Sequence, residues 1–352
     1  MTNQALPRPS RELLESNLKG CQNLGLILDK FAPWGQDQRG QWDLVVKSTV
    51  RQRGQNIVKV LSSGEAKGIW LNTQRKALRG ETPSLFEFPR TDEALMAERQ
   101  ERWLALVRAE GGMAFTIRTM TRLVVGLGAS HVLETGITLE RNTGLPYIPG
   151  SAVKGLARAR GLIQLARALG VEIGNDDAEN KCLNDLDELL ATKPKGEWRQ
   201  ELRHTFGTSD DISEEAEMIA EWFRFIFGAR EHAGAVIFLD AIYAEADAPH
   251  YVTDVMTPHY VSYYTKQGGA PPSENDNPNP VSFLAVEQES VFAFGLLPRR
   301  AAFKDMKKKD IEMALGAARD WLRGALTQLG AGGKTAAGYG FFSGKSLEEL
   351  TD

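Results

Sequence analysis

Hydrophobic positions along the chain recur with two periods, the 3.6-residue period of amphipathic helices and the two-residue period of strands. The pattern is clear from residue 92 onward. Residues 1–90 mix short apolar stretches with glycine and tryptophan, which predicts irregular or short-stranded structure. Helices are predicted over 92–110, 152–169, 214–227 and 310–329. Strands are predicted over 113–128, 131–140 and 234–244, as a pair within 281–297, and over 339–344.

The strongest elements from residue 113 onward follow the order strand, helix, strand, strand, helix, strand. That order is the split β-α-β arrangement of ferredoxin-like domains. It is also the topology of the RRM, whose sheet binds single-stranded RNA. We therefore predict an α+β fold with a ferredoxin-like, RRM-like core. The predicted division is an N-terminal extension over 1–110 and a core over 111–352, with insertions at about 171–230 and 245–287.

Composition places the chain among folded globular proteins, because 42% of its 352 residues are hydrophobic and 25% are charged. Cys21 and Cys182 are too few for a disulfide framework or a cysteine-based zinc site. No apolar run approaches the ~20 residues of a membrane span, and the N-terminus lacks the apolar segment of a secretory signal. We expect a soluble cytoplasmic protein without a membrane partner.

Charge is unevenly divided along the chain, whose net charge is −4. Residues 1–170 carry 24 Lys and Arg against 15 Asp and Glu, whereas residues 171–352 carry 18 against 31. Such segregation is typical of a protein with one side toward a polyanion and another toward solvent or basic partners. The alternative is that these blocks are ordinary solvated faces.

A glycine-rich stretch at 330–340, Gly-Ala-Gly-Gly-Lys-Thr-Ala-Ala-Gly-Tyr-Gly, is the first candidate for anion binding. It is not a P-loop, because Gln328 stands where the first glycine is required and the predicted helix precedes the loop. Its backbone N–H groups can approach an anion closely, with Lys334 and Thr335 at the centre and Tyr339 available to stack on a base. The alternative is a helix-to-strand connector that needs positive φ.

The second candidate is the segment 148–160, Ile-Pro-Gly-Ser-Ala-Val-Lys-Gly-Leu-Ala-Arg-Ala-Arg. Ser151 is predicted to cap a helix whose first-turn N–H groups suit a phosphate. Lys154 and Arg158 share one face of that helix at spacing i and i+4. The alternative is an ordinary capped amphipathic helix with a solvated basic face.

The five histidines show no metal-ligand spacing, so neither a metal nor a cofactor is expected. His131 precedes Glu134 in the sequence, and the two residue types suit an acid/base pair for RNA cleavage; the alternative is an ordinary polar contact of a loop histidine. A further group of aromatic side chains can stack bases, form a partner surface or pack in the core. This group comprises Tyr251, His259, Tyr260, Tyr263 and Tyr264.

Several separated motifs resemble the RAMP superfamily of CRISPR proteins. They are the segment 144–159 with its Leu-Pro-Tyr-Ile-Pro-Gly-Ser run and the glycine-rich loop at 330–342. The segments 121–139, 227–241 and 254–264 are similar to one branch of the superfamily, a subunit of the type III-B (Cmr) effector complex. The similarity covers about residues 113–345, and residues 1–110 match only loosely.

This resemblance implies a non-catalytic, RNA-binding subunit of an antiviral ribonucleoprotein that acts on target RNA. Such a subunit caps the complex at the 3′ part of the CRISPR RNA. Its implied partners are the CRISPR RNA, single-stranded target RNA through the complex, the backbone RAMP subunit, the small helical subunit and the terminal RAMP subunit. The predicted RNA-binding residues are Ser151, Lys154, Arg158, Gly332, Gly333, Lys334, Thr335, Tyr339, His131 and Arg141.

Two other functions stay open from the sequence. One is a RAMP endoribonuclease that processes repeat RNA, with His131 as general acid or base. The other is a protein adaptor whose acidic half docks basic partners. The overall charge of −4 is unusual for an isolated RNA binder, so we expect weak RNA binding by the chain alone and firm binding within an assembly.

Overall fold

The chain divides into two compact units, each assembled from segments that are separate in sequence. The computed structural model describes residues 23–30, 32, 34–36, 41–44, 46–52, 55–61, 67, 70, 93–129, 131, 135–171, 177–194, 196–206, 212–257, 280–304 and 307–351. Unit 1 comprises residues 1–96, 122–147 and 246–287, and unit 2 comprises residues 97–121, 148–245 and 288–352. The sequence-based division at residue 110 stays a prediction.

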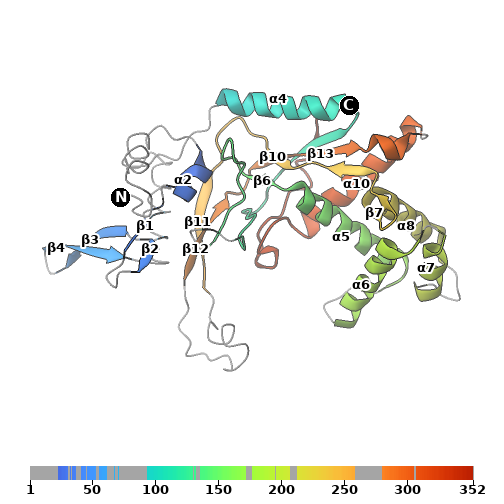
Figure 1. The fold of residues 1–352 in the computed structure, drawn as a ribbon, viewed down its shortest axis with the longest axis horizontal. Helices are drawn as coiled ribbons and strands as arrows, with labels where there is room; N and C mark the ends of the chain where they lie inside the picture. The colour runs from blue at the N-terminus through green and yellow to red at the C-terminus, as the bar shows by residue number, and fades with distance from the viewer. Residues whose placement is uncertain are drawn as a thin grey trace. The chain divides into compact units, whose positions relative to one another are not determined.

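Helices and strands are labelled in Figure 1. The α-helices are α2 (Leu24–Lys30), α4 (Glu93–Ala109), α5 (Gly150–Ala168), α6 (Asp177–Thr192), α7 (Trp198–Phe206), α8 (Glu214–Phe227) and α10 (Lys308–Gln328), and the 3₁₀ helices are η2 (Arg300–Phe303) and η3 (Thr335–Ala337). The strands are β1 (Trp34–Gln36), β2 (Trp42–Leu44), β3 (Val46–Gln52), β4 (Gln55–Leu61), β5 (Met113–Arg118), β6 (Tyr147–Ile148), β7 (Gly228–Ala229), β8 (His232–Ala233), β9 (Val236–Phe238), β10 (Ala241–Tyr243), β11 (Tyr251–Met256), β12 (Val281–Val286), β13 (Val291–Pro298) and β14 (Glu348–Glu349). The four predicted helices are thus confirmed to within two residues at either end.

The main sheet has the strand order β14-β5-β13-β10-β6, with β9 also paired to β13. β5 is antiparallel to both β13 and β14, and β13 is antiparallel to β10. When β9 and β10 are counted as one broken strand, the first four positions hold the fourth, first, third and second strands of a β-α-β-β-α-β unit. This is the ferredoxin-like arrangement, so the predicted α+β fold is confirmed.

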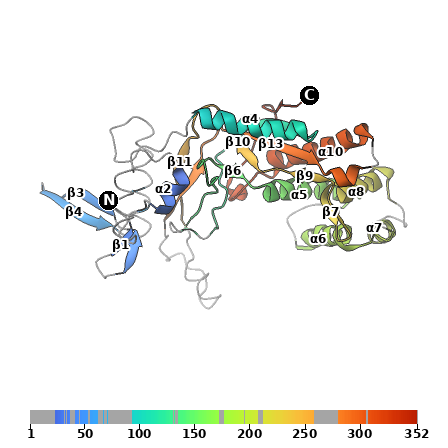
Figure 2. The same cartoon turned by 45° about the horizontal axis from the view of Figure 1, so that its top comes forward.

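Helices cover both faces of this sheet in unit 2, α4 on one side and α5 with α10 on the other (Figure 2). On the α5/α10 side Phe294 stacks on Phe115, with ring centroids 5.5 Å apart. On the other side Trp103 of α4 packs over Gly295, where a Cβ would lie 2.7 Å from the indole. Val107 of α4 extends this packing, because it is completely buried in a cluster with β5 and β13.

The strand predicted over 234–244 is broken into β9 and β10. Phe238 pairs with Leu296, but Ile242 pairs with Ala293, so the three residues between these pairs on one strand oppose two on the other. One extra residue in an antiparallel strand is a β-bulge, which bends the strand and redirects the side chains at the break. The bulge places Asp240 at the start of α5, where its carboxylate accepts a hydrogen bond from Gly150 N at 2.6 Å.

The predicted closing strand over 339–344 is wrong. Gly338 and Gly340 have φ of 88° and 77°, which no extended strand allows. Phe342 makes only an isolated bridge to Thr119. The fourth strand is β14, a few residues later, and it pairs with β5.

The acidic insertion within 171–230 forms α6, α7 and α8 in unit 2. α8 has strong end signals, because the Ser213 hydroxyl accepts a hydrogen bond from Ala216 N and the chain leaves the helix at Gly228 with φ of 89°. The first turn carries Glu214, Glu215 and Glu217, whose negative charges interact favourably with the positive end of the helix dipole.

Unit 1 is described only in part. It contains the antiparallel pairs β1–β2, β3–β4 and β11–β12, together with α2. Arg122 donates hydrogen bonds to Asp254 at 2.8 Å and to Glu287 at 3.3 Å, and these two bonds raise its pKa against the opposing effect of burial. Of the predicted aromatic group only Tyr251 lies within the described residues, where it is buried, and the other four fall outside them.

Candidate nucleic-acid interface

The glycine-rich loop follows α10 and is shaped by positive φ angles. Gly332 and Lys334 have φ of 81° and 60°, while Gly333 between them and the residues of η3 after them do not have positive φ. Lys334 is in the left-handed region, which costs a non-glycine residue of order 1 kcal/mol or more. The backbone here holds an unfavourable conformation, and such positions cluster at ligand sites.

Several backbone donors lie close together in the sequence of this loop. Among the described residues, the N–H groups of Gly332, Gly333, Thr335 and Ala336 have no hydrogen-bond acceptor. Successive N–H groups in alternating left- and right-handed conformations form a concave nest for anions. Gly332 and Ala336 are exposed, so an anion can reach the nest. We call Gly332–Ala336 the loop nest.

The rest of the loop is closed by internal bonds. Ala331 N donates to Gly340 O at 2.8 Å, and Tyr339 N donates to Lys334 O at 3.2 Å. At Gly340 a Cβ would overlap the carbonyl oxygen of Ala331, so the loop closes only with glycine there. The Tyr339 side chain is half-buried.

The start of α5 is less open to an anion than the sequence predicts. Ser151 is not the N-cap, because the helix begins at Gly150 with Pro149 before it and no side-chain cap. Gly150 N is bonded to Asp240, and the N–H groups of Ala152 and Val153 donate to Pro149 O, whereas no such bond is made by Ser151 N. The Asp240 carboxylate therefore takes the place at this helix end that the sequence assigned to phosphate.

Gly150 is required at this position by a close approach of the bulged strand. A Cβ there would overlap the carbonyl oxygen of Phe238. The Pro-Gly pair thus serves packing of α5 against β9 as well as helix initiation. The Ser151 side chain is exposed beside it.

Lys154 is half-buried and holds another helix. Its Nζ donates to the backbone oxygen of Phe227, the last residue of α8, at 3.0 Å. A cation is favourable at the carbonyl end of a helix. Burial, and after it the charges of Arg158 and Arg299, lower the pKa of Lys154.

Arg158 fastens α5 to the same insertion. Its guanidinium pairs with Asp187 of α6 and lies over the ring of Phe223 of α8, 5.1 Å from the centroid. Lys154 and Arg158 are therefore both engaged inside unit 2. Their predicted contact with RNA stays a prediction.

The start of α5 and the loop nest lie at the same end of the α5–α10 pair, because the two helices pack antiparallel. Trp321 Nε1 donates to Gln164 at 2.9 Å, and three residues further along α10 a Cβ at Gly324 would touch Arg160. Moving toward the end of α10 thus moves toward the start of α5. Figure 1 shows the red segment after α10 beside the first turns of α5.

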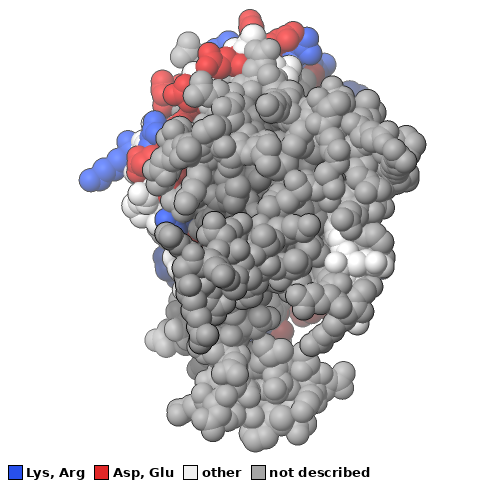
Figure 3. Space-filling view, turned by 90° about the vertical axis from the view of Figure 1, so that its left-hand side faces the viewer, with Lys and Arg blue, Asp and Glu red and all other residues white. Residues whose placement is uncertain are grey.

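The sheet itself does not offer an RRM-like surface. The face opposite α5 and α10 is covered by α4. The prediction of an exposed sheet face that binds RNA, which was drawn from the topology, is therefore wrong. The outward side of α4 mixes both signs of charge, as in the pair Arg102–Glu98. Figure 3 shows red and blue atoms mingled at the top of its view, which is a solvated surface rather than a basic stripe.

His131 and Arg141, the two predicted contacts in unit 1, have separate surroundings. His131 Nε2 lies 3.0 Å from Asp29 Oδ1. Arg141 has an exposed side chain in the turn 141–143, and its backbone oxygen accepts a bond from Asn23.

Sequence reasoning missed three residues that bear on these sites. Asp240 reaches α5 only because of the bulge, which leaves no local signal. Asp29 is distant in sequence from His131. Lys67 is 2% exposed and donates to Thr135 Oγ1 at 2.6 Å, although lysine is a residue type that is seldom buried.

No helix in the described part of the chain is long and apolar enough to cross a membrane. The same residues contain no cluster of His, Cys, Asp and Glu that could hold a metal ion.

Comparisons with known proteins agree with the motifs. A family model described as the RAMP superfamily matches residues 116–343. The Cmr subunit Cmr6 of Pyrococcus furiosus is 36% identical over 237 residues, which are 63% of this chain and 65% of that relative. The chain thus matches just under two thirds of the relative's length.

Solved structures are also similar. A type III-B Cmr-beta complex bound to cognate target RNA contains a chain with 20% identity and a TM-score of 0.46, covering 82% of this chain and 76% of its own length. Crystalline Cmr6 from Pyrococcus furiosus shows 30% identity and a TM-score of 0.39, covering 68% and 98%. The family match spans the core with both glycine-containing motifs, so the chain belongs to the RAMP superfamily, and it is similar to Cmr6.

Proposed function

We propose that this chain is a non-catalytic, RNA-binding subunit of a type III-B CRISPR ribonucleoprotein in the cytoplasm. It caps the complex at the 3′ part of the CRISPR RNA and contacts neighbouring RAMP and small helical subunits, and through the complex it meets target RNA. The similarity to Cmr6 supports the assignment to such a complex. The loop nest is the observation that carries the RNA-binding role.

The loop nest suits a phosphate of any nucleotide. Its donors are backbone N–H groups, which contact phosphate without reading bases. Guide RNAs have variable sequences, so a protein that holds them gains from contacts of this kind. Lys334 adds a charge at the centre of the nest, Ser151 is exposed at the same end of the helix pair, and Tyr339 is available for stacking.

The test separates backbone geometry from charge in the assembled complex. Lys334→Gly keeps the left-handed conformation and removes the charge, whereas Gly332→Ala keeps the charge and disfavours the backbone of the nest. We expect both to weaken retention of CRISPR RNA. The loss of one phosphate contact should reduce the salt slope, d log K/d log[salt], by about 0.7 for single-stranded RNA.

Lys308→Gly is the matched control, because Lys308 is an exposed lysine at the opposite end of α10. It removes the same charge and should leave retention unchanged. Equal loss in the control would show that the nest has no special role. Retention that survives both loop substitutions would refute the proposed site.

A second function is favoured by one observation, the contact between His131 and Asp29. A carboxylate that orients a histidine is a common arrangement for general acid/base catalysis. Under this alternative the chain cleaves repeat RNA without a metal. Labelled repeat RNA incubated with the full chain and EDTA distinguishes the two, since cleavage that is lost in both His131→Ala and Asp29→Asn would favour the enzyme.

A further inference from the structure

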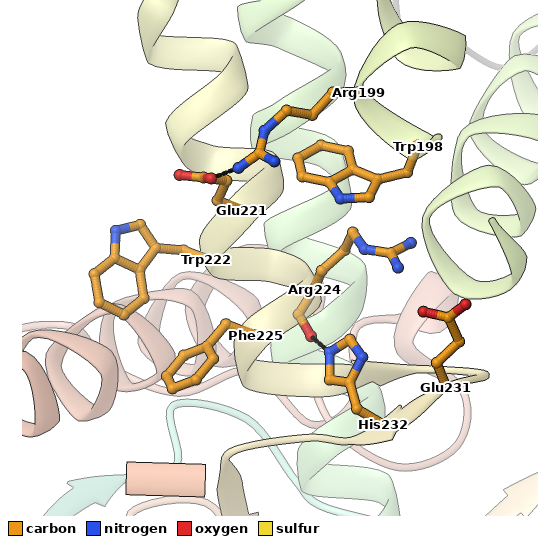
Figure 4. A pocket seen from close by; sticks show the side chains of 8 residues that line it. All are labelled: Trp198, Arg199, Glu221, Trp222, Arg224, Phe225, Glu231 and His232. Atoms are coloured by element: carbon orange, nitrogen blue, oxygen red, sulfur yellow. Dashed lines mark hydrogen bonds and ion pairs between the residues drawn. The ribbon is translucent and has the colours of Figure 1, made fainter. Parts of the chain in front are cut away.

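A cavity of about 630 Å³ opens in the helical insertion of unit 2, away from the loop nest. Figure 4 shows side chains from α7, α8 and the β7–β8 hairpin converging on it. Among the residues that line it are Trp198, Arg199, Glu221, Trp222, Phe225 and Glu231. The lining combines large aromatic rings with both signs of charge.

The two arginine side chains of the cavity already bind groups of the protein itself. Arg199 pairs with Glu217 at 3.1 Å and with Glu221. Arg224 is 3% exposed and donates to the backbone oxygens of Leu190 and of Lys193. Neither guanidinium is presented to an incoming anion.

Trp198 shows how this cavity binds a guanidinium. The Arg199 side chain lies over its ring at 4.8 Å from the centroid, and Arg224 lies over it at 5.4 Å. Trp222 stands across the Arg199–Glu221 pair from Trp198 (Figure 4) and is half-buried. Within the described residues no cation lies over the Trp222 ring, whose only ring contact is an edge with Phe225 at 5.9 Å.

Carboxylates surround the open side. Glu231 is exposed, and the Glu221 side chain is 50% exposed even with its ion pair. An aromatic face beside exposed carboxylates complements a cation, and most strongly a planar guanidinium, which stacks and accepts bidentate pairing at once.

We propose that this cavity receives an arginine-bearing segment of a partner protein. The guanidinium stacks on Trp222 and pairs with Glu221, apolar atoms of the segment cover Phe225, and Glu231 on the far side of the cavity adds negative charge. The inference rests on the proposed function in one respect, that the partner is another protein subunit of the assembly. An RNA base is the weaker occupant, because the same carboxylates repel the phosphates attached to it.

Photocrosslinking in the reconstituted complex identifies the occupant. The full chain carries p-benzoylphenylalanine in place of His232, an exposed residue of the cavity lining, so that Trp222 is kept, and is co-assembled with the other subunits and CRISPR RNA. We expect a crosslink to a protein peptide that contains arginine. A crosslink to RNA, a crosslink within this chain, or none at all in an assembled complex would overturn the proposal.

Substitutions give the energetic test. Trp222→Ala, and separately Glu221→Gln with Glu231→Gln, should weaken retention of the crosslinked subunit about tenfold, since an unscreened cation–π or charge pair accounts for about that factor. Glu214→Gln with Glu215→Gln removes the same charge outside the cavity and should change retention less than twofold. An equal loss of retention in the two double variants would show that only the overall charge matters and would contradict the proposal.

Two readouts keep this inference separate from the proposed function. Thermal unfolding of each variant identifies a variant that has lost its fold, and Trp222→Phe then replaces Trp222→Ala. The RNA retained by the complex is measured in parallel and should not change in the cavity variants. If the cavity variants lose the crosslinked subunit but keep the RNA, the effect belongs to the cavity alone. If the unaltered chain fails to assemble, the proposed function is refuted.

Discussion

Single glycines in unit 2 are fixed by close backbone contacts rather than by flexibility. Gly340 combines a φ of 77° with direct contact to Ala331, and Gly150 is confined by the backbone of β9. Gly316, in the middle of α10, has open space where its Cβ would be. The same residue type therefore has opposite roles in one fold.

The first prediction contrasts two of these positions. Gly340→Ala should lower the free energy of unfolding by about 3 kcal/mol or more, because both φ and the overlap with Ala331 are unfavourable. Gly316→Ala should raise it by about 0.5–1 kcal/mol, because alanine suits a helix interior. Urea unfolding of the full chain measures both, and a stable Gly340→Ala variant would contradict the loop geometry.

Residue roles were the least predictable part of the site. The composition of 330–340 identified the loop, since glycines beside a lysine are a local signal. The contacts of Lys154 and Arg158 within the protein had no such signal. Their partners, Phe227 and Asp187, lie in an insertion whose packing the sequence does not specify.

At the scale of elements, α5 is the helix of the core that contacts the helices of the insertion. Lys154 holds the end of α8, and Arg158 links α6 and α8 to the same helix. These contacts connect the acidic insertion to the ferredoxin-like core. Lys154 and Arg158, whose i and i+4 spacing suggested an RNA-binding face, thus position two neighbouring helices.

The second prediction concerns this connection. Arg158→Ala should destabilise unit 2 by about 1–2 kcal/mol, because it removes an ion pair whose side chains are 27% and 33% exposed and a stack on Phe223. A double-mutant cycle with Asp187→Asn should give a coupling of about 1 kcal/mol. Additive effects in that cycle would show that the ion pair contributes nothing.

The third prediction concerns α4. Because this helix covers the second face of the sheet, charge reversal on its exposed side should not affect RNA. Arg102→Glu, at a side chain that is 77% exposed, should leave retention of CRISPR RNA in the complex unchanged. A marked loss would place RNA along α4 instead of at the loop nest.

Element order was predictable from the sequence because the helices carry strong end signals, such as Ser213 and Gly228 around α8. The strands were less predictable. The bulge between β9 and β10 depends on register with β13, and β14 is only Glu348–Glu349. The cover provided by α4 was also missed, because an amphipathic helix does not specify which sheet face it packs on.

At the scale of the molecule, unit 1 depends on segments far apart in sequence. His131 contacts Asp29, Lys67 donates to Thr135, and the backbone of Arg141 accepts a bond from Asn23. Described residues from the first third of the chain thus contact the segment 122–147 of the same unit.

The fourth prediction follows from these contacts. A fragment of residues 111–352 should leave the unit 1 segments 122–147 and 246–287 without their partners. We expect rapid trypsin cleavage within those segments and increased binding of ANS, relative to the full chain. A fragment that resists cleavage and unfolds cooperatively would instead support an N-terminal extension that is separate from the core.

The interleaving of the two units has a consequence for biosynthesis. Residues 1–96 leave the ribosome first, but the last segment of their unit ends at Glu287. At about 5–20 residues per second, the ribosome needs roughly 10–40 s to make the intervening stretch. For that time the apolar side chains of the nascent N-terminal segment lack their final neighbours, which makes this segment the natural client of ribosome-associated chaperones.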